Sequence, residues 1–161
     1  MSFFIWLAES ALGHAIRESL WLYPTMLSLH AVGMTVVVGL LLMIDLRVLG
    51  FAKAIPMPSL DRLYTVAWIG FILNLLSGSM LFAGDAPRFV TSVPFIIKIV
   101  CIVIGGVLAW LLARAVAAAP GDGSGAMPGN ARAIAAISMI VWVTAITSGR
   151  LTAYIMTGDT P

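Results

Sequence analysis

The chain has 161 residues, of which 61% are hydrophobic and only 10% are charged. Soluble domains carry about 25% charged residues, so this composition excludes a soluble globular protein and indicates one that lies in a lipid bilayer. The net charge of +2 comes from dispersed basic residues, which excludes a nucleic-acid-binding surface as well.

The cysteine content and the first residues narrow the class further. Cys101 is the single cysteine and lies in an apolar segment. One thiol excludes an internal disulfide, a metal site of paired cysteines and a covalently attached c-type haem. The opening sequence MSFFIWLAES has no basic region and no small-residue cleavage pattern. We therefore expect no removable signal peptide, and targeting by the spans themselves.

Residues 2–18 begin with aromatic and aliphatic side chains and then turn mixed. Ser10, His14 and Arg17 lie on one helical face at spacings of three and four. This mixture predicts a short helix in the membrane interface. Pro24 follows early in the next helix, where proline is tolerated.

Four apolar segments then follow, each long enough to cross a hydrocarbon core of about 30 Å. The predicted spans are at about 20–44, 63–84, 91–113 and 133–157. Residues 119–130 are rich in glycine and proline, which predicts a flexible loop. Little chain remains outside the spans. The sequence thus predicts an all-α integral membrane four-helix bundle that forms one domain over residues 1–161.

Basic residues in the short connections predict the orientation. The connections after the first and third spans carry Arg47, Lys53, Arg62, Arg114 and Arg132, and the other end carries Arg17 and Arg88. Five basic residues at one end against two at the other favour an orientation with both termini outside, which is the periplasm for a bacterial inner membrane.

The polar residues of all four spans lie at a similar depth in this topology, in the outer half of the bilayer. They are His30, Asn74, Ser77, Ser79, Lys98, Thr147, Ser148 and Arg150. A charge within a span costs at least about 2.5 kcal/mol on insertion scales, so Lys98 and Arg150 are expected to face the bundle interior. The resulting site is electropositive, has no intramembrane carboxylate and requires an anionic ligand.

A b-type haem meets this requirement. His30 would bind the iron through one ring nitrogen, while Lys98 and Arg150 would pair with the propionates. Gly33 lies beside His30 on the same face and would let a flat macrocycle or another helix approach. Ser77 lies at the depth of the same site.

The second axial ligand stays open. His14 reaches the iron only if residues 10–23 fold back across the mouth of the bundle, because one straight helix would hold it about 24 Å from His30. Met80 is another candidate, and five-coordinate iron is the third possibility.

Each of these residues also has a plain structural interpretation. His30 is then a hydrogen-bonded packing residue, and Lys98 and Arg150 extend to the headgroups. The methionines Met26, Met34 and Met80 fill the core, and His14 lies on the interfacial surface. Asp45 and Arg47 are expected to form a solvated helix end with a local ion pair. The shared depth of the polar residues favours a site.

A weak internal similarity links the two halves of the chain. The segments LLSGSMLFA (75–83) and ITSGRLTAY (146–154) both place Ser-Gly near the outer end of the second helix of a hairpin. Two related hairpins explain the similarity, and so does chance similarity between apolar helices.

The segments AIRESLWLYP (15–24), LHAVGMTVVVGLLLMIDLRVLG (29–50), SGSMLFAGDAPRF (77–89) and PFIIKIV (94–100) resemble an uncharacterised family of four-helix bacterial membrane proteins. That family is distantly similar to the HemJ-type protoporphyrinogen oxidases and to the membrane domain of CopD-like copper-resistance proteins. The resemblance to HemJ-type proteins implies that His30 is a haem-iron ligand and that Lys98 is a functional cation. The sequence after His30 is VGMTVVVG where those enzymes have a Trp-rich motif, which leaves substrate and reaction open.

Four functions remain in competition. The preferred one is a haem b protein that carries single electrons between the quinone pool and an outer-face redox partner. The second is a haem-dependent oxidase of a porphyrinogen-like or other lipophilic substrate, whose carboxylates Lys98 and Arg150 would bind. The third is copper handling along a face formed by Met26, His30, Met34 and Met80, because soft ligands suit Cu(I). The fourth is a structural subunit of a membrane complex, and a homo-oligomer is expected on the same lipid-facing surfaces.

Overall fold

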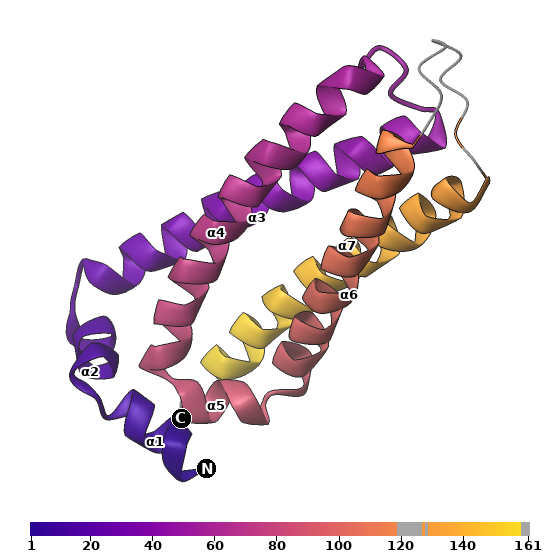
Figure 1. Cartoon of the computed structure of the whole chain (residues 1–161). Helices are drawn as coiled ribbons and strands as arrows, with labels where there is room; N and C mark the ends of the chain where they lie inside the picture. The colour runs from indigo at the N-terminus through magenta and orange to yellow at the C-terminus, as the bar shows by residue number, and fades with distance from the viewer. Residues whose placement is uncertain (119–126, 128, 159–161) are drawn as a thin grey trace.

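The fold is all-α, as the sequence predicts (Figure 1). The computed structural model describes residues 1–118, 127 and 129–158, and these contain no strand. The elements in chain order are α1 (Ser2–Ala8), α2 (Ala11–Glu18), α3 (Leu22–Leu49), the 3-10 helix η1 (Met57–Ser59), α4 (Leu60–Gly84), α5 (Ala86–Thr91), α6 (Val93–Ala117) and α7 (Gly129–Gly158).

Four of these helices, α3, α4, α6 and α7, are long and apolar enough to cross a membrane, with mean hydropathy between 1.6 and 2.7. Their outward faces carry exposed leucine, isoleucine, valine and tryptophan side chains, which suits contact with lipid. The protein is therefore a multi-pass membrane protein of four spans.

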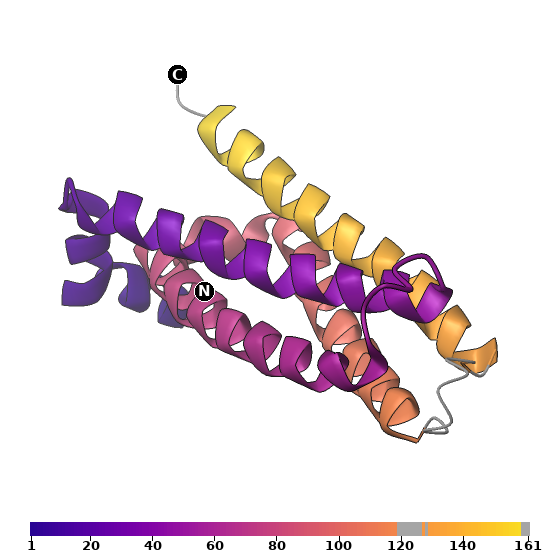
Figure 2. The same ribbon diagram turned by 90° about the horizontal axis from the view of Figure 1, so that it is seen from above.

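The four spans form two antiparallel hairpins. In the first, α3 packs along α4, and in the second α6 packs along α7; the hairpins join mainly where α3 meets α7. The N-terminus, α5 and the last turns of α7 lie at one end of the bundle, here called the termini end, while the end of α3 and the start of α4 lie at the opposite end (Figures 1 and 2). At the termini end, the stacked rings of Phe82 and Phe95 connect α4 to α6. Elsewhere the backbones of α4 and α6 hardly approach each other.

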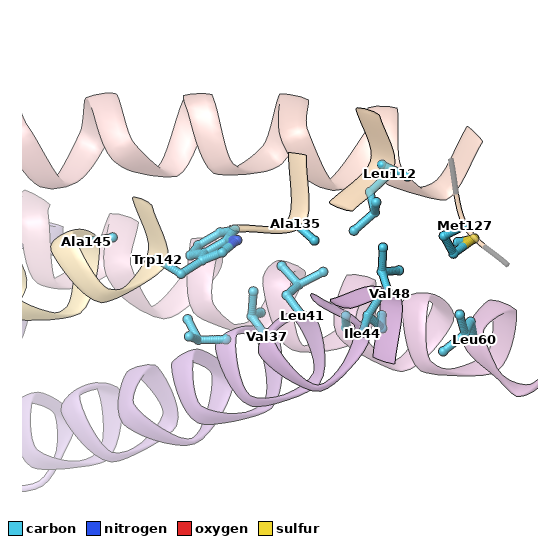
Figure 3. Close-up of a cluster of buried hydrophobic side chains, with 13 residues drawn as sticks. Val37, Leu41, Ile44, Val48, Leu60, Leu112, Met127, Ala135, Trp142 and Ala145 are labelled. Atoms are coloured by element: carbon cyan, nitrogen blue, oxygen red, sulfur yellow. The ribbon is translucent and has the colours of Figure 1, made fainter. Parts of the chain in front are cut away.

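The apolar core lies in the half of the bundle nearer the opposite end (Figure 3). It includes Ile44 and Val48 of α3, Leu60 of α4, Leu112 of α6 and Trp142 of α7. The Trp142 indole packs against Gly105 of α6, where an added Cβ would lie 2.8 Å from the ring. A small residue at that point lets α6 and α7 approach closely, as is common between membrane helices.

The helix that contains the first predicted span, α3, continues to Leu49, beyond the predicted end of the span near residue 44. Gly50 ends the helix in the left-handed conformation, with φ 96°. Its N–H bonds to the Arg47 carbonyl, and the Phe51 N–H bonds to the Leu46 carbonyl. These bonds cap the last carbonyl groups of α3, which is the usual role of glycine at this position.

The helix end is also not the solvated ion pair that the sequence predicts. Asp45 is only 2% exposed. Arg47 forms no ion pair with it among the described residues and instead donates from Nε to the Ile55 carbonyl at 2.6 Å. The prediction failed because burial of Asp45 depends on α4 and α7, which the sequence of α3 does not reveal.

The single interfacial helix predicted over residues 2–18 is two helices, α1 and α2. Ser10 interrupts it: its hydroxyl donates to the Leu7 carbonyl and accepts from the Gly13 N–H, and so caps α2. Ile16 of α2 is fully buried against Gly84 at the end of α4. Much of the loop predicted at 119–130, residues 119–126 and 128, lies outside the described residues, and Gly129 and Asn130 belong to α7.

Candidate functional site

His30 of α3 points toward α4 and not toward lipid. Its ring Nδ1 lies 3.0 Å from the Asn74 carbonyl oxygen, and the Asn74 side-chain amide donates to the His30 carbonyl at 2.8 Å. A backbone carbonyl only accepts, so Nδ1 carries the hydrogen and Nε2 presents its lone pair. The predicted site residue Ser77 also lies here, with its hydroxyl 3.4 Å from Nδ1. The ring is thus held in one tautomer by α4.

Two glycines make this contact between α3 and α4 possible. A Cβ on Gly33 would lie 2.8 Å from the backbone nitrogen of Asn74. A Cβ on Gly78 would lie 2.8 Å from Cε1 of the His30 ring. Gly33 therefore serves the approach of a helix, and its face is covered by α4 instead of being open to a macrocycle.

Lys98 of α6 meets His30 from the other hairpin. Its Nζ lies 3.4 Å from His30 Nε2, a long hydrogen bond in which the ammonium donates to the lone pair. The aliphatic part of the side chain packs on α7, where a Cβ on Gly149 would lie 3.3 Å from Lys98 Cδ. Among the described residues no acidic group forms an ion pair with Lys98. His30 and Lys98, which the sequence predicts at a similar depth, therefore lie together in the structure.

The two hairpins repeat one arrangement at this point. His30 on the first helix of its hairpin lies against Gly78 of the second, and Lys98 on the first helix of its hairpin lies against Gly149 of the second. Both glycines follow a buried serine, Ser77 and Ser148, whose hydroxyl bonds to its own helix. This repeated geometry favours related hairpins over chance as the origin of the Ser-Gly similarity.

A cavity of about 30 Å³ lies beside this pair. All four spans contribute to its lining, which is Met34, Val37, Val38, Phe71, Asn74, Lys98, Ile102, Trp142, Ala145 and Ile146. Such a volume holds about one or two water molecules, whereas pockets for organic ligands measure roughly 300–1,000 Å³. The indole Nε1 of Trp142 is buried without a hydrogen-bond acceptor among the described residues.

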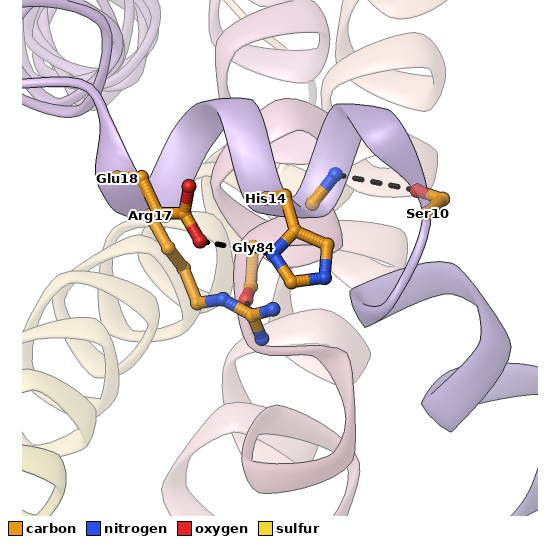
Figure 4. Close-up of polar contacts among 6 residues, drawn as sticks. Ser10, His14, Arg17, Glu18 and Gly84 are labelled. Carbon is orange, nitrogen blue, oxygen red and sulfur yellow. Dashed lines mark hydrogen bonds and ion pairs between the residues drawn. The ribbon is translucent and has the colours of Figure 1, made fainter.

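Two other predicted site residues, Arg150 and His14, have their contacts elsewhere. Arg150 is exposed, and its guanidinium lies 5.7 Å from the centre of the Tyr154 ring. His14 is exposed on α2 and pairs with Glu18 at 3.0 Å (Figure 4). Arg17, also on α2, donates to the Gly84 carbonyl, which ties α2 to α4 (Figure 4). Met80 is half-buried on α4. His14 and Arg150 thus make their contacts away from the His30–Lys98 pair, and Met80 stays a prediction as the second axial ligand of an iron.

Whether the site fits a haem has two different answers. The donor chemistry fits, because Nε2 of His30 points inward and a hydrogen bond from Nδ1 to a backbone carbonyl fixes the tautomer, as is usual for metal-binding histidines. The space beside His30 does not fit a haem, because Lys98 covers Nε2 and the cavity is too small for a macrocycle. A haem would require Lys98 to leave His30 and the hairpins to separate.

Comparison of the chain with family models, curated proteins and solved structures found no match. Fold and geometry define its class: a four-span helical membrane protein with a half-buried histidine–lysine pair at the junction of two hairpins.

Proposed function

We propose that the protein is a membrane-embedded b-type haem protein that transfers electrons. The observation that supports the proposal is the lone pair of His30 Nε2, held toward the bundle interior beside the Lys98 ammonium. A haem iron, when bound, supplies a one-electron couple. Asn74 orients the imidazole, and Lys98 provides a positive charge suited to an anionic propionate.

The setting proposed for this function is a bacterial inner membrane with both termini in the periplasm. The distribution of basic residues supports that orientation. The proposed partners are the quinone pool, an outer-face redox protein and further copies of the chain. The exposed apolar faces of α4 and α6 offer surface for such contacts within the bilayer.

We propose that the hairpins separate between α4 and α6 when a haem binds. The backbones of α4 and α6 hardly approach each other, so opening there breaks few contacts and leaves α3 on α4 and α6 on α7. Lys98 is a flexible side chain with a long bond to His30, so its displacement is a small change.

Copper binding is the second candidate, and the size of the cavity favours it. A cavity of about 30 Å³ suits a single ion, and Met34 lines it as a soft ligand. The charge of Lys98 opposes it, because an ammonium beside the ligand nitrogen repels a metal cation and attracts an anion. We therefore rank haem before copper.

Spectra and metal content of the purified protein distinguish the two candidates. The protein should be prepared in detergent from cells supplied with haem precursor and with copper. We expect a Soret band that shifts on reduction, with iron in proportion to protein. A colourless protein with stoichiometric Cu(I) would transfer the proposal to copper, and a colourless protein free of both metals would reject the two together.

A further inference from the structure

A second buried polar cluster lies near the opposite end of the bundle, away from His30. It consists of Asp45 of α3, Tyr64 of α4 and Ser138 of α7. Asp45 is 2% exposed and Ser138 is 1% exposed. A hydrogen bond links the Asp45 carboxyl to the Ser138 side chain, and Tyr64 lies within electrostatic reach of Asp45. Asp45 and His30 are 15 residues apart on α3, or about 22 Å along the helix.

Two polar atoms of this cluster have unused hydrogen-bonding capacity. Asp45 Oδ2 and the Tyr64 hydroxyl are both buried, and neither has a hydrogen-bond partner within the described part of the chain. Buried polar atoms are rarely left without a partner, so an unpaired carboxylate oxygen facing a bundle interior indicates that it binds something. The atom or ion bound there must be small.

Within the part of the chain that the structure describes, no lysine, arginine or histidine forms an ion pair with Asp45. Arg47 donates to the Ile55 carbonyl, Arg114 stacks on Trp110, and Arg62 and Arg132 are exposed. On α4, the neighbouring titratable groups are Tyr64, which lies within electrostatic reach of Asp45, and Asp61, which is exposed. Residues 119–126, 128 and 159–161 include no lysine, arginine or histidine. A buried carboxylate without a counter-charge is strongly unfavourable, so a bound cation or proton must neutralise it.

The groups available around Asp45 distinguish a bound metal cation from a bound proton. Metal cations that bind oxygen, such as Ca²⁺ and Mg²⁺, take six or more ligands, and one carboxylate with two hydroxyl groups does not provide them. No group of three or more potential acidic, histidine or cysteine ligands occurs in the described ranges. A proton requires only the single free oxygen, which Asp45 has.

We propose that Asp45 carries an exchangeable proton in the folded protein, in a site formed with Ser138 and Tyr64. Ser138 bonds to the Asp45 carboxyl, and the proton lies on Oδ2, which is buried and has no hydrogen-bond partner among the described residues. In the proposed orientation this site lies near the inner surface, so it exchanges its proton with the inner aqueous phase. The proposal does not depend on haem or on His30.

Infrared spectroscopy of the full-length protein in an ester-free detergent tests it directly. At neutral pH we expect the C=O stretching band of a protonated carboxylic acid, and labelling with ¹³C-aspartate should shift it. The band should also shift in D₂O, because the proton exchanges. Asp45→Asn should remove it, whereas the matched control Asp61→Asn, at an exposed position on α4, should leave it unchanged.

Ser138→Ala provides a second variant in case Asp45→Asn fails to fold. Loss of the hydrogen bond from Ser138 should move the band to higher frequency. Absence of any labelled aspartic-acid band in the wild-type protein at neutral pH would overturn the proposal. So would a band that disappears when Na⁺ is added at constant pH, because that result would assign the site to a metal cation. A band that stays unchanged in D₂O would overturn the exchange with water.

Discussion

Replacing Gly33 with valine is expected to destabilise the bundle by about 2 kcal/mol or more, the range found for overpacked contacts. The atoms that the new side chain would meet are backbone atoms, at 2.8 Å for the Asn74 nitrogen and 3.0 Å for the Gly70 carbonyl oxygen. Backbone atoms cannot rotate away, so α3 and α4 must separate. That separation also breaks the hydrogen bonds between His30 and Asn74.

The chain offers a matched control on the same helix. Gly39 of α3 has no atom within 4 Å of an added Cβ, so Gly39→Val should change stability by less than about 0.5 kcal/mol. The measurement is unfolding in mixed detergent micelles followed by circular dichroism. Equal stability of the two variants would contradict the close packing of α3 on α4.

Lys98→Met should have opposite effects on stability and on cofactor content. Lys98 is a charge within a span that has no acidic partner in the described residues, and replacing it with an apolar side chain removes the cost of placing a charge in the bilayer. We expect a gain of about 1 kcal/mol, which corresponds to about 3 °C in melting temperature for a chain of this size. Loss of a charge-assisted bond to the proposed propionate should lower haem affinity about tenfold.

Lys53→Met is the control, because Lys53 is the other lysine of the chain and is exposed. Lys53→Met should leave the melting temperature and the haem affinity at their wild-type values. If Lys98→Met instead lowers the melting temperature and leaves the cofactor content unchanged, Lys98 has a structural role only.

The spans could be predicted because long apolar runs are required to cross a bilayer, and the depth of each polar residue follows from its place in the run. The rotation of each helix about its axis could not be predicted, because the bundle-facing and lipid-facing sides of a membrane helix are both apolar. This is why Arg150 was predicted to face inward and is exposed. Ser148 and Gly149 occupy the inner face of α7, and the next residue turns about 100° away.

The residues that sequence analysis missed are those whose role depends on a second helix. Asn74 was placed at the right depth, but its paired bonds with His30 require α3 and α4 to be in register. Gly78 and Gly149 lie in the Ser-Gly segments, which were the available signal, yet their contacts with His30 and Lys98 come only from the fold. The break at Ser10 had a local signal, because serine is a preferred helix N-cap.

The proposed haem site is tested most directly by comparing the two histidines of the chain. His30→Ala and His14→Ala should be purified beside the wild-type protein and their Soret absorbance measured per mole of protein. The proposal predicts that His30→Ala loses the band while His14→Ala, changed at an exposed position, keeps it. A wild-type Soret band that persists undiminished in His30→Ala would contradict the assignment of His30 as the iron ligand.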